Sequence, residues 1–389
     1  MNRPVPTGAA RRHRGGVRAN ATARPALRRW LLWGAIALLF VVGALVVSAA
    51  IGLQVGGRAA GVALVAAVVP LLVVVPAFLW LDRFEAEPPR YLMFAFGWGA
   101  LVATTVAIVL NTGSMIFLSE TYIDADEIAS VVVAPIVEES LKGLGVLLVL
   151  LVRRREFDGV IDGVVYAGLC AAGFAFAENV LYLGQAYNDQ GTAGIAATFF
   201  VRCVLGPFAH PLFTLWTGIG IGIAASRRGV LARLAPFVGL AFAIVVHAAW
   251  NLSAVAGIEG FWSAYLLLQV PIFLTAIGVV VWARRREGRL IHEHLVTYAR
   301  HGWLTPPEVT MLGTIGGRRE ARRWAQRAGG RRMKQAMVAF QDDAVDLAML
   351  RQRMTHGTAG PDAADRELTL LHSITNARAG FRRQSPVLV

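Results

Sequence analysis

The sequence predicts an all-α membrane protein, a polytopic bundle of about eight transmembrane helices followed by a small cytoplasmic helical C-terminal domain. Composition is the first reason, because 56% of the 389 residues are hydrophobic and only 16% are charged. That is far too apolar for a soluble protein of this size. The second reason is that eight apolar segments are long enough to cross a hydrocarbon core of about 30 Å. They span residues 30–51, 59–81, 91–118, 129–152, 158–185, 197–224, 231–256 and 261–283.

The distribution of charge predicts how the bundle is oriented. The net charge is +13, and the arginines gather in residues 1–29, in alternate short loops and directly after the last segment. The third loop is instead acidic, with Glu120, Asp124, Asp126 and Glu127. Because basic loops stay in the cytoplasm, we expect a multi-pass protein of the cell membrane with both termini cytoplasmic. The partners expected from charge are anionic lipids at that face, and no nucleic acid.

Three regions follow from these patterns. The expected regions are a basic, disordered cytoplasmic arm at residues 1–29, a membrane domain at 30–283 and a cytoplasmic helical tail domain at 288–389. In the tail, Thr305-Pro306 is typical of a helix start, and Gly329-Gly330 is typical of a break between helices. The sequence indicates no chemistry for the tail. The only cysteines, Cys170 and Cys203, lie in apolar segments and exclude a disulfide framework.

Two adjacent carboxylates in the fourth segment are the strongest sign of a functional site. Charged groups are costly inside a bilayer, so those that occur there usually face the bundle interior. Glu138 and Glu139 are followed by Lys142 at i+4 and i+3 spacing, from which the ammonium group can neutralise one carboxylate. A structural ion pair that holds the bundle together would leave the other glutamate unpaired. The pattern therefore favours function.

The fifth segment adds a third carboxylate. Glu178 is followed directly by Asn179 and, one turn later, by Tyr182. The simpler interpretation is a structural hydrogen-bond cluster of these three side chains. Arg202, near the outer end of the sixth segment, is interpreted as a side chain that snorkels toward the membrane surface, and its pairing with a carboxylate stays open. Supporting roles at the site are expected for Lys142, Asn179 and Tyr182.

Two histidines complete the set of candidates. His210 lies between Pro207 and Pro211, which predicts a bent helix with space around the imidazole. His247 and Asn251 are one turn apart on one helix face, so both can point to the same place. Counted from the predicted outer ends, the glutamates and histidines all lie roughly 10–20 Å below the outer surface. We therefore expect one shared site, closer to the outside than to the cytoplasm.

Taken in order, these motifs resemble those of the PrsW family of intramembrane proteases. They are EExxK (Glu138, Glu139, Lys142), FxxxEN (Phe174, Glu178, Asn179), a lone His210 and HxxxN (His247, Asn251). The resemblance covers about residues 60–283 and extends distantly to the CAAX-processing and bacteriocin-immunity proteases. It implies a polytopic protease, in places assigned as a metalloprotease, that makes a first cut in a membrane-tethered regulator such as an anti-sigma factor. In the CAAX-type relatives the second motif ends in His, where this chain has Glu178.

The predicted function is hydrolysis of a peptide bond in a membrane-anchored protein. One of the two adjacent glutamates would deprotonate water, while His210, His247 and Asn251 would hold the water or stabilise the oxyanion. Glu178 would orient a histidine. An alternative with zinc has the metal bound by His210, His247 and Glu178, with one position open. The residues do not separate these two mechanisms.

Two other classes of function fit the same side chains. Intramembrane carboxylates and imidazoles also form proton relays, which makes a proton-coupled transporter the first alternative. A transporter often shows two related half-sequences, and the chain shows no such repeat. The second alternative is a non-catalytic membrane adaptor whose working part is the cytoplasmic tail.

Overall fold

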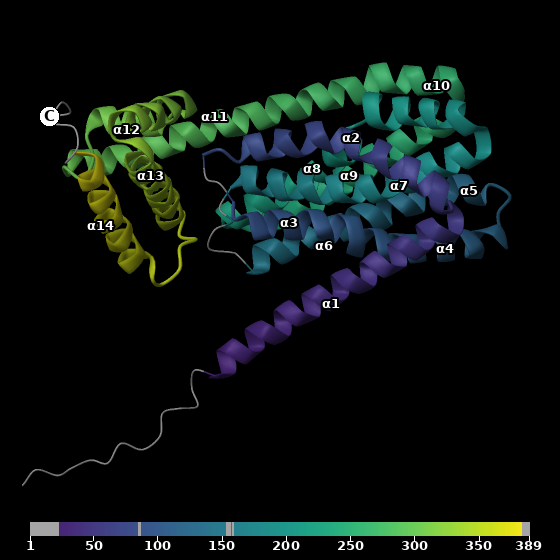
Figure 1. Ribbon diagram of the computed structural model, residues 1–389, viewed down its shortest axis with the longest axis horizontal. Coiled ribbons are helices and arrows are strands. Elements are labelled where there is room, and N and C mark those ends of the chain that lie inside the picture. The colour runs from purple at the N-terminus through teal and green to yellow at the C-terminus, as the bar shows by residue number, and fades with distance from the viewer. Residues whose placement is uncertain (1–22, 85–86, 153–156, 158, 383–389) are drawn as a thin grey trace, which may run out of the picture.

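The computed structural model describes residues 23–84, 87–152, 157 and 159–382 of the chain. Within them all regular secondary structure is helical (Figure 1). Six helical stretches of this described part are long and apolar enough to cross a membrane, which supports a helical membrane bundle. The predicted arm at residues 1–29 falls largely outside the described residues, as does the arginine loop at 153–155. The orientation of the termini stays a prediction.

The membrane region contains long helices that are interrupted by short π-helical turns, labelled η. In chain order they are α1 (Ala23–Gln54), α2 (Gly57–Leu81), α3 (Pro89–Gly97), η1 (Trp98–Ala103), α4 (Thr104–Ser119), α5 (Ala125–Ile128), η2 (Ala129–Val133), α6 (Ala134–Val152), α7 (Val160–Phe199), η3 (Phe200–Leu205), α8 (Ala209–Ser226), α9 (Val230–Val255), α10 (Gly257–Ala264), η4 (Tyr265–Gln269) and α11 (Val270–Arg300).

The number of membrane crossings depends on how the stretch Val160–Ser226 and the helix α6 are counted. One of the six apolar stretches, Val160–Ser226, contains both the fifth and the sixth predicted segment. The fourth predicted segment forms η2 and α6 and is not among the six, since α6 carries Glu138, Glu139 and Lys142. Eight crossings therefore stay a prediction, whereas the helical, multi-pass character of the chain is supported.

The predicted sixth segment, residues 197–224, does not form one helix. The π-helical turn η3 ends at Leu205 and α8 begins only at Ala209, so the chain breaks around Gly206 and Pro207. Proline has no amide hydrogen to continue a helix, which accounts for the break. His210 consequently lies in the first turn of α8. The bend expected beside this histidine is present, but the continuous span is corrected to two pieces.

The centre of the bundle is α7, which packs with its backbone close to neighbouring helices. A Cβ atom at Gly163 would lie 2.0 Å from the carbonyl oxygen of Gly218 in α8. Further along the helix, a Cβ atom at Gly173 would lie 2.0 Å from the carbonyl oxygen of Phe96 in α3. Small residues permit such close approach in membrane helices. These two glycines of α7 therefore permit the close approach of α8 and α3.

The tail is helical and lies at one end of the bundle (Figure 1), connected to it by the continuous helix α11. Its elements are α12 (Pro306–Leu312), α13 (Ile315–Thr355) and α14 (Ala363–Arg382). Thr305 caps α12 together with Glu308, and α13 is kinked at Gly329 and Gly330, as expected from the sequence. Phe84, from the loop after α2, packs into the tail's apolar cluster. That the tail folds as an independent domain stays a prediction.

Candidate active site

The charged side chains of α6 point into the bundle. Glu139 and Lys142 have no exposed surface, and Glu138 is 4% exposed. The Nζ atom of Lys142 lies 2.8 Å from Oε1 of Glu139 and 3.4 Å from Oε2 of Glu138. One ammonium group therefore contacts both carboxylates, which offsets part of the cost of burying them.

Glu139 is held by partners on two further helices. Its Oε1 atom lies 3.0 Å from Nδ1 of His247 on α9, and its Oε2 atom accepts a hydrogen bond of 2.7 Å from Thr214 on α8. A carboxylate at Nδ1 fixes the orientation of an imidazole and leaves Nε2 available to bind a metal or to exchange a proton. Glu139 thus positions His247. Thr214 was not predicted at the site, although it lies one helical turn after His210.

Glu138 differs from its neighbour because it faces a cavity of about 530 Å³. Glu178, His210, His247 and Asn251 line the same cavity, whereas Glu139 and Lys142 do not. Adjacent residues of a helix point about 100° apart, which explains why one glutamate reaches the cavity and the other stays in the packed interior. The structure therefore distinguishes two carboxylates that the sequence left equivalent.

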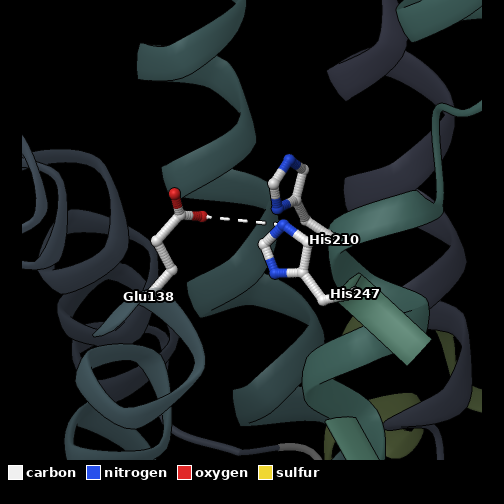
Figure 2. A group of neighbouring side chains, drawn as sticks. All are labelled: Glu138, His210 and His247. Atoms are coloured by element: carbon white, nitrogen blue, oxygen red, sulfur yellow. Dashed lines mark ion pairs between the residues drawn. The ribbon is translucent and has the colours of Figure 1, made fainter. Parts of the chain in front are cut away.

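The two imidazoles lie beside Glu138 (Figure 2), and Nε2 of His247 is 3.9 Å from its Oε2 atom. One ligand atom from each of Glu138, His210 and His247 lies within 4.8 Å of the other two. Two imidazoles and one carboxylate form a donor set known from catalytic zinc sites. The carboxylate of Glu139 behind His247 is the outer partner that such a ligand usually has. These residues therefore fit a divalent metal.

Glu178 contacts His210 but does not belong to that group of three. Its Oε2 atom lies 2.8 Å from Nε2 of His210 and forms an ion pair with Arg202. Arg202 also donates a hydrogen bond of 2.7 Å to Asn179 and stacks 4.2 Å from the ring centre of Tyr182. Of the two possibilities that the sequence left open for Arg202, the structure has the pairing with a carboxylate. The expected link between Glu178, Asn179 and Tyr182 exists through Arg202.

Two amide side chains form hydrogen bonds between elements of the cavity wall. Asn251 donates a hydrogen bond of 2.8 Å to the carbonyl oxygen of Ser130 in η2, so it joins α9 to the start of α6. Asn111 on α4 donates one of 3.4 Å to Oε1 of Glu138. Asn111 was not predicted at the site. Its position as a polar residue in the third apolar segment carries the same kind of signal as the glutamates.

These observations define a class, a polytopic helical membrane protein with a buried carboxylate–imidazole centre that opens on a cavity. Comparison with known proteins finds similarity to one family. Residues 87–276 match the model of the PrsW family intramembrane metalloprotease. This match spans α3 to α11 and contains every residue assigned to the site. The family match and the relatives described below support a PrsW family intramembrane protease, with the similarity carried by residues 87–276.

Individual relatives agree with this assignment. The Protease PrsW of Clostridioides difficile (strain 630) is 28% identical over 223 residues, which cover 55% of this chain and 87% of that protein. The Protease PrsW of Oceanobacillus iheyensis is 27% identical over 224 residues, which cover 56% and 93%. That of Bacillus subtilis (strain 168) is 25% identical over 160 residues, which cover 41% and 67%. No solved structure matches the chain.

Proposed function

We propose that the protein is an endopeptidase that cuts a membrane-anchored regulatory protein of the anti-sigma-factor type, within or next to the bilayer. The observation that carries the proposal is that the two adjacent glutamates have different surroundings. Glu138 reaches the cavity together with both histidines, whereas Glu139 is buried behind them. A water molecule in the cavity would meet one carboxylate and two imidazoles at once.

The supporting residues make this arrangement rigid before any substrate arrives. Glu139 holds His247 through Nδ1, and Lys142 lies 3.1 Å from Nδ1 of His210. Each imidazole therefore has one nitrogen engaged by a buried partner and presents the other toward Glu138 or Glu178. Groups that are already oriented lose little entropy in the reaction, which is a main source of enzymatic rate.

Glu138 is central to both ways of activating water. Without a metal, its carboxylate takes a proton from water as the oxygen attacks the peptide carbonyl carbon, and the proton then passes to the leaving amine. With a metal, Glu138, His210 and His247 would hold a divalent ion, which when bound would polarise the carbonyl group and lower the pKa of water. The family description as a metalloprotease favours the second.

Cleavage by the purified protein tests the proposal. The full chain would be reconstituted in liposomes with a panel of single-span regulatory proteins, and products would be identified by mass spectrometry. We expect a cut near the membrane that His247→Ala abolishes. Loss of cleavage with a chelator and its recovery with zinc would support the metal mechanism, and indifference to the chelator would support Glu138 as the base. No cut in any panel member, together with proton flux into the liposomes, would contradict a protease and favour a transporter.

A further inference from the structure

A second cavity, of about 820 Å³, lies where the membrane bundle meets the tail. Its walls come from the end of α2, from the middle of α11 and from the turn between α12 and α13. It shares no lining residue with the cavity of the candidate active site. Figure 1 shows α11 running from the bundle to the tail, so this cavity lies at the junction of the two. Its volume is that of a typical small-molecule site.

The charge of this junction cavity is strongly positive. Four arginines line it, at positions 284, 285, 289 and 319, together with His292 and a single carboxylate, Glu293. Just outside the lining, Arg83 and Glu287 also act electrostatically on Arg284. Several arginines around one cavity are an arrangement that suits phosphate recognition.

Arg284 has a buried hydrogen-bond donor that is not satisfied. It is only 8% exposed, and its guanidinium group is stacked 3.7 Å from the ring centre of Trp80. Its Nη1 atom is buried and has no hydrogen-bond partner among the described residues. A buried donor without an acceptor costs about 1–3 kcal/mol, more for a charged group. An anion in the cavity would satisfy it.

Two further features define the anion. The turn that begins α13 forms part of the wall, and the N-terminus of this long helix is a favourable place for negative charge. Part of the wall is apolar, and its residues Trp80 and Val281 are partly exposed on the surface of α2 and α11. A ligand that suits both sides has a phosphate group joined to an apolar chain.

We propose that the junction cavity binds the headgroup of an anionic phospholipid, with the phosphate at Arg284 and the acyl chains along the apolar surface of α2 and α11. Basic pockets beside membrane helices are known to hold such headgroups. The bound lipid contacts the bundle and the tail together. It therefore fixes the tail at a defined place relative to the membrane, independently of the peptidase chemistry.

Native mass spectrometry of the full-length protein tests this site. The probe is a short-chain phosphatidylglycerol, compared with phosphatidylcholine of the same chain length and with glycerol phosphate. We expect Arg284→Gln to weaken phosphatidylglycerol binding by about tenfold or more, as for loss of a charged hydrogen bond. The matched control is Arg286→Gln, because Arg286 lies on the same helix and stacks on Trp282 outside the cavity. Its effect should be much smaller.

Arg319→Gln provides a second variant on the opposite wall, at an exposed position where folding is not at risk. We expect it to weaken binding in the same direction. Equal binding of phosphatidylglycerol by the Arg284, Arg319 and Arg286 variants would overturn the proposal. So would equally tight binding of phosphatidylcholine, or of free glycerol phosphate, since the first needs no anion and the second needs no lipid.

Discussion

The ammonium group of Lys142 lies 2.8 Å from the carboxylate of Glu139 at a place where neither side chain has any exposed surface. The same ammonium nitrogen is 3.1 Å from Nδ1 of His210, and the same carboxylate is 3.0 Å from Nδ1 of His247. One buried ion pair therefore connects α6 to both helices that carry the histidines. The stability of the bundle and the geometry of the site depend on the same atoms.

Lys142→Met should strongly destabilise the protein. The substitution leaves two buried carboxylates without their cation, and breaking a buried pair in this way typically costs about 3–5 kcal/mol. Thermal unfolding in detergent measures the effect. Adding Glu139→Gln to Lys142→Met removes the uncompensated charge, so the double variant should be more stable than Lys142→Met alone. Strictly additive losses would show that the two side chains are not coupled.

The metal mechanism predicts a divalent metal that depends on His247. The purified protein should retain zinc or another divalent metal by elemental analysis, and His247→Ala should lose it because a ligand nitrogen is removed. Asn251→Ala is the matched control on the same helix, since its amide donates to the Ser130 carbonyl oxygen. Equal metal content in both variants would remove His247 from the metal site.

Gly163→Ala should disrupt the packing of α7 on α8. The new Cβ atom would lie 2.0 Å from the carbonyl oxygen of Gly218, which is backbone and cannot move aside as a side chain would. Overpacking of this kind typically costs about 1–3 kcal/mol. Gly113→Ala, at a helical position with open space around it, should leave the melting temperature unchanged or raise it. Similar melting temperatures for both variants would contradict the close approach.

The sequence was sufficient to predict the helical class and the polar side chains that the structure brings together. Glu138, Glu178, His210 and His247 stand out because charge and imidazole are rare in apolar segments, and each lies on a different helix. The bend predicted from the prolines beside His210 is also present in the structure. Such signals are local in the sequence, so they can be recognised without knowledge of the tertiary structure.

Long-range geometry could not be predicted in the same way. Ideal helix geometry gives Lys142 no clear choice between Glu138 and Glu139, and only the packing of α8 and α9 decides which one faces the cavity. Arg202 is ordinary as a residue near the end of a span, and its role arises from Glu178, which lies 24 positions earlier in the chain. Phe84 joins the tail's core across an even larger separation.

Stability of the tail should depend on pH through Asp346. Burial raises the pKa of this carboxyl from 3.8 to about 6. The negative charges of Asp343 and Asp342 raise the pKa further, whereas the positive charges of Arg366 and Arg353 lower it. A raised folded-state pKa means that the stabilising contribution is complete below 3.8 and is lost as pH rises to about 6.

Asp346→Asn should therefore stabilise α13 and α14 above that window, on the order of 1 kcal/mol after solvent screening. Hydrogen exchange of the two helices in the full-length protein, measured below and above the window, is the readout. We expect a gain at the higher pH and little change at the lower pH. A destabilised variant at the higher pH would mean that Asp346 works there as a charged partner of the arginines.

Cleavage by Glu138→Gln tests the central claim, that the glutamate facing the cavity carries the chemistry. Gln keeps the shape of the side chain but can neither accept the proton nor bind a metal as an anionic ligand. We expect its cleavage rate to fall by about 10²–10⁴, the usual contribution of such a group, with normal accumulation in the membrane. The control is Glu120→Gln, an exposed residue outside the cavity, which should cleave at the wild-type rate. Near-normal cleavage by Glu138→Gln would contradict the site assigned here.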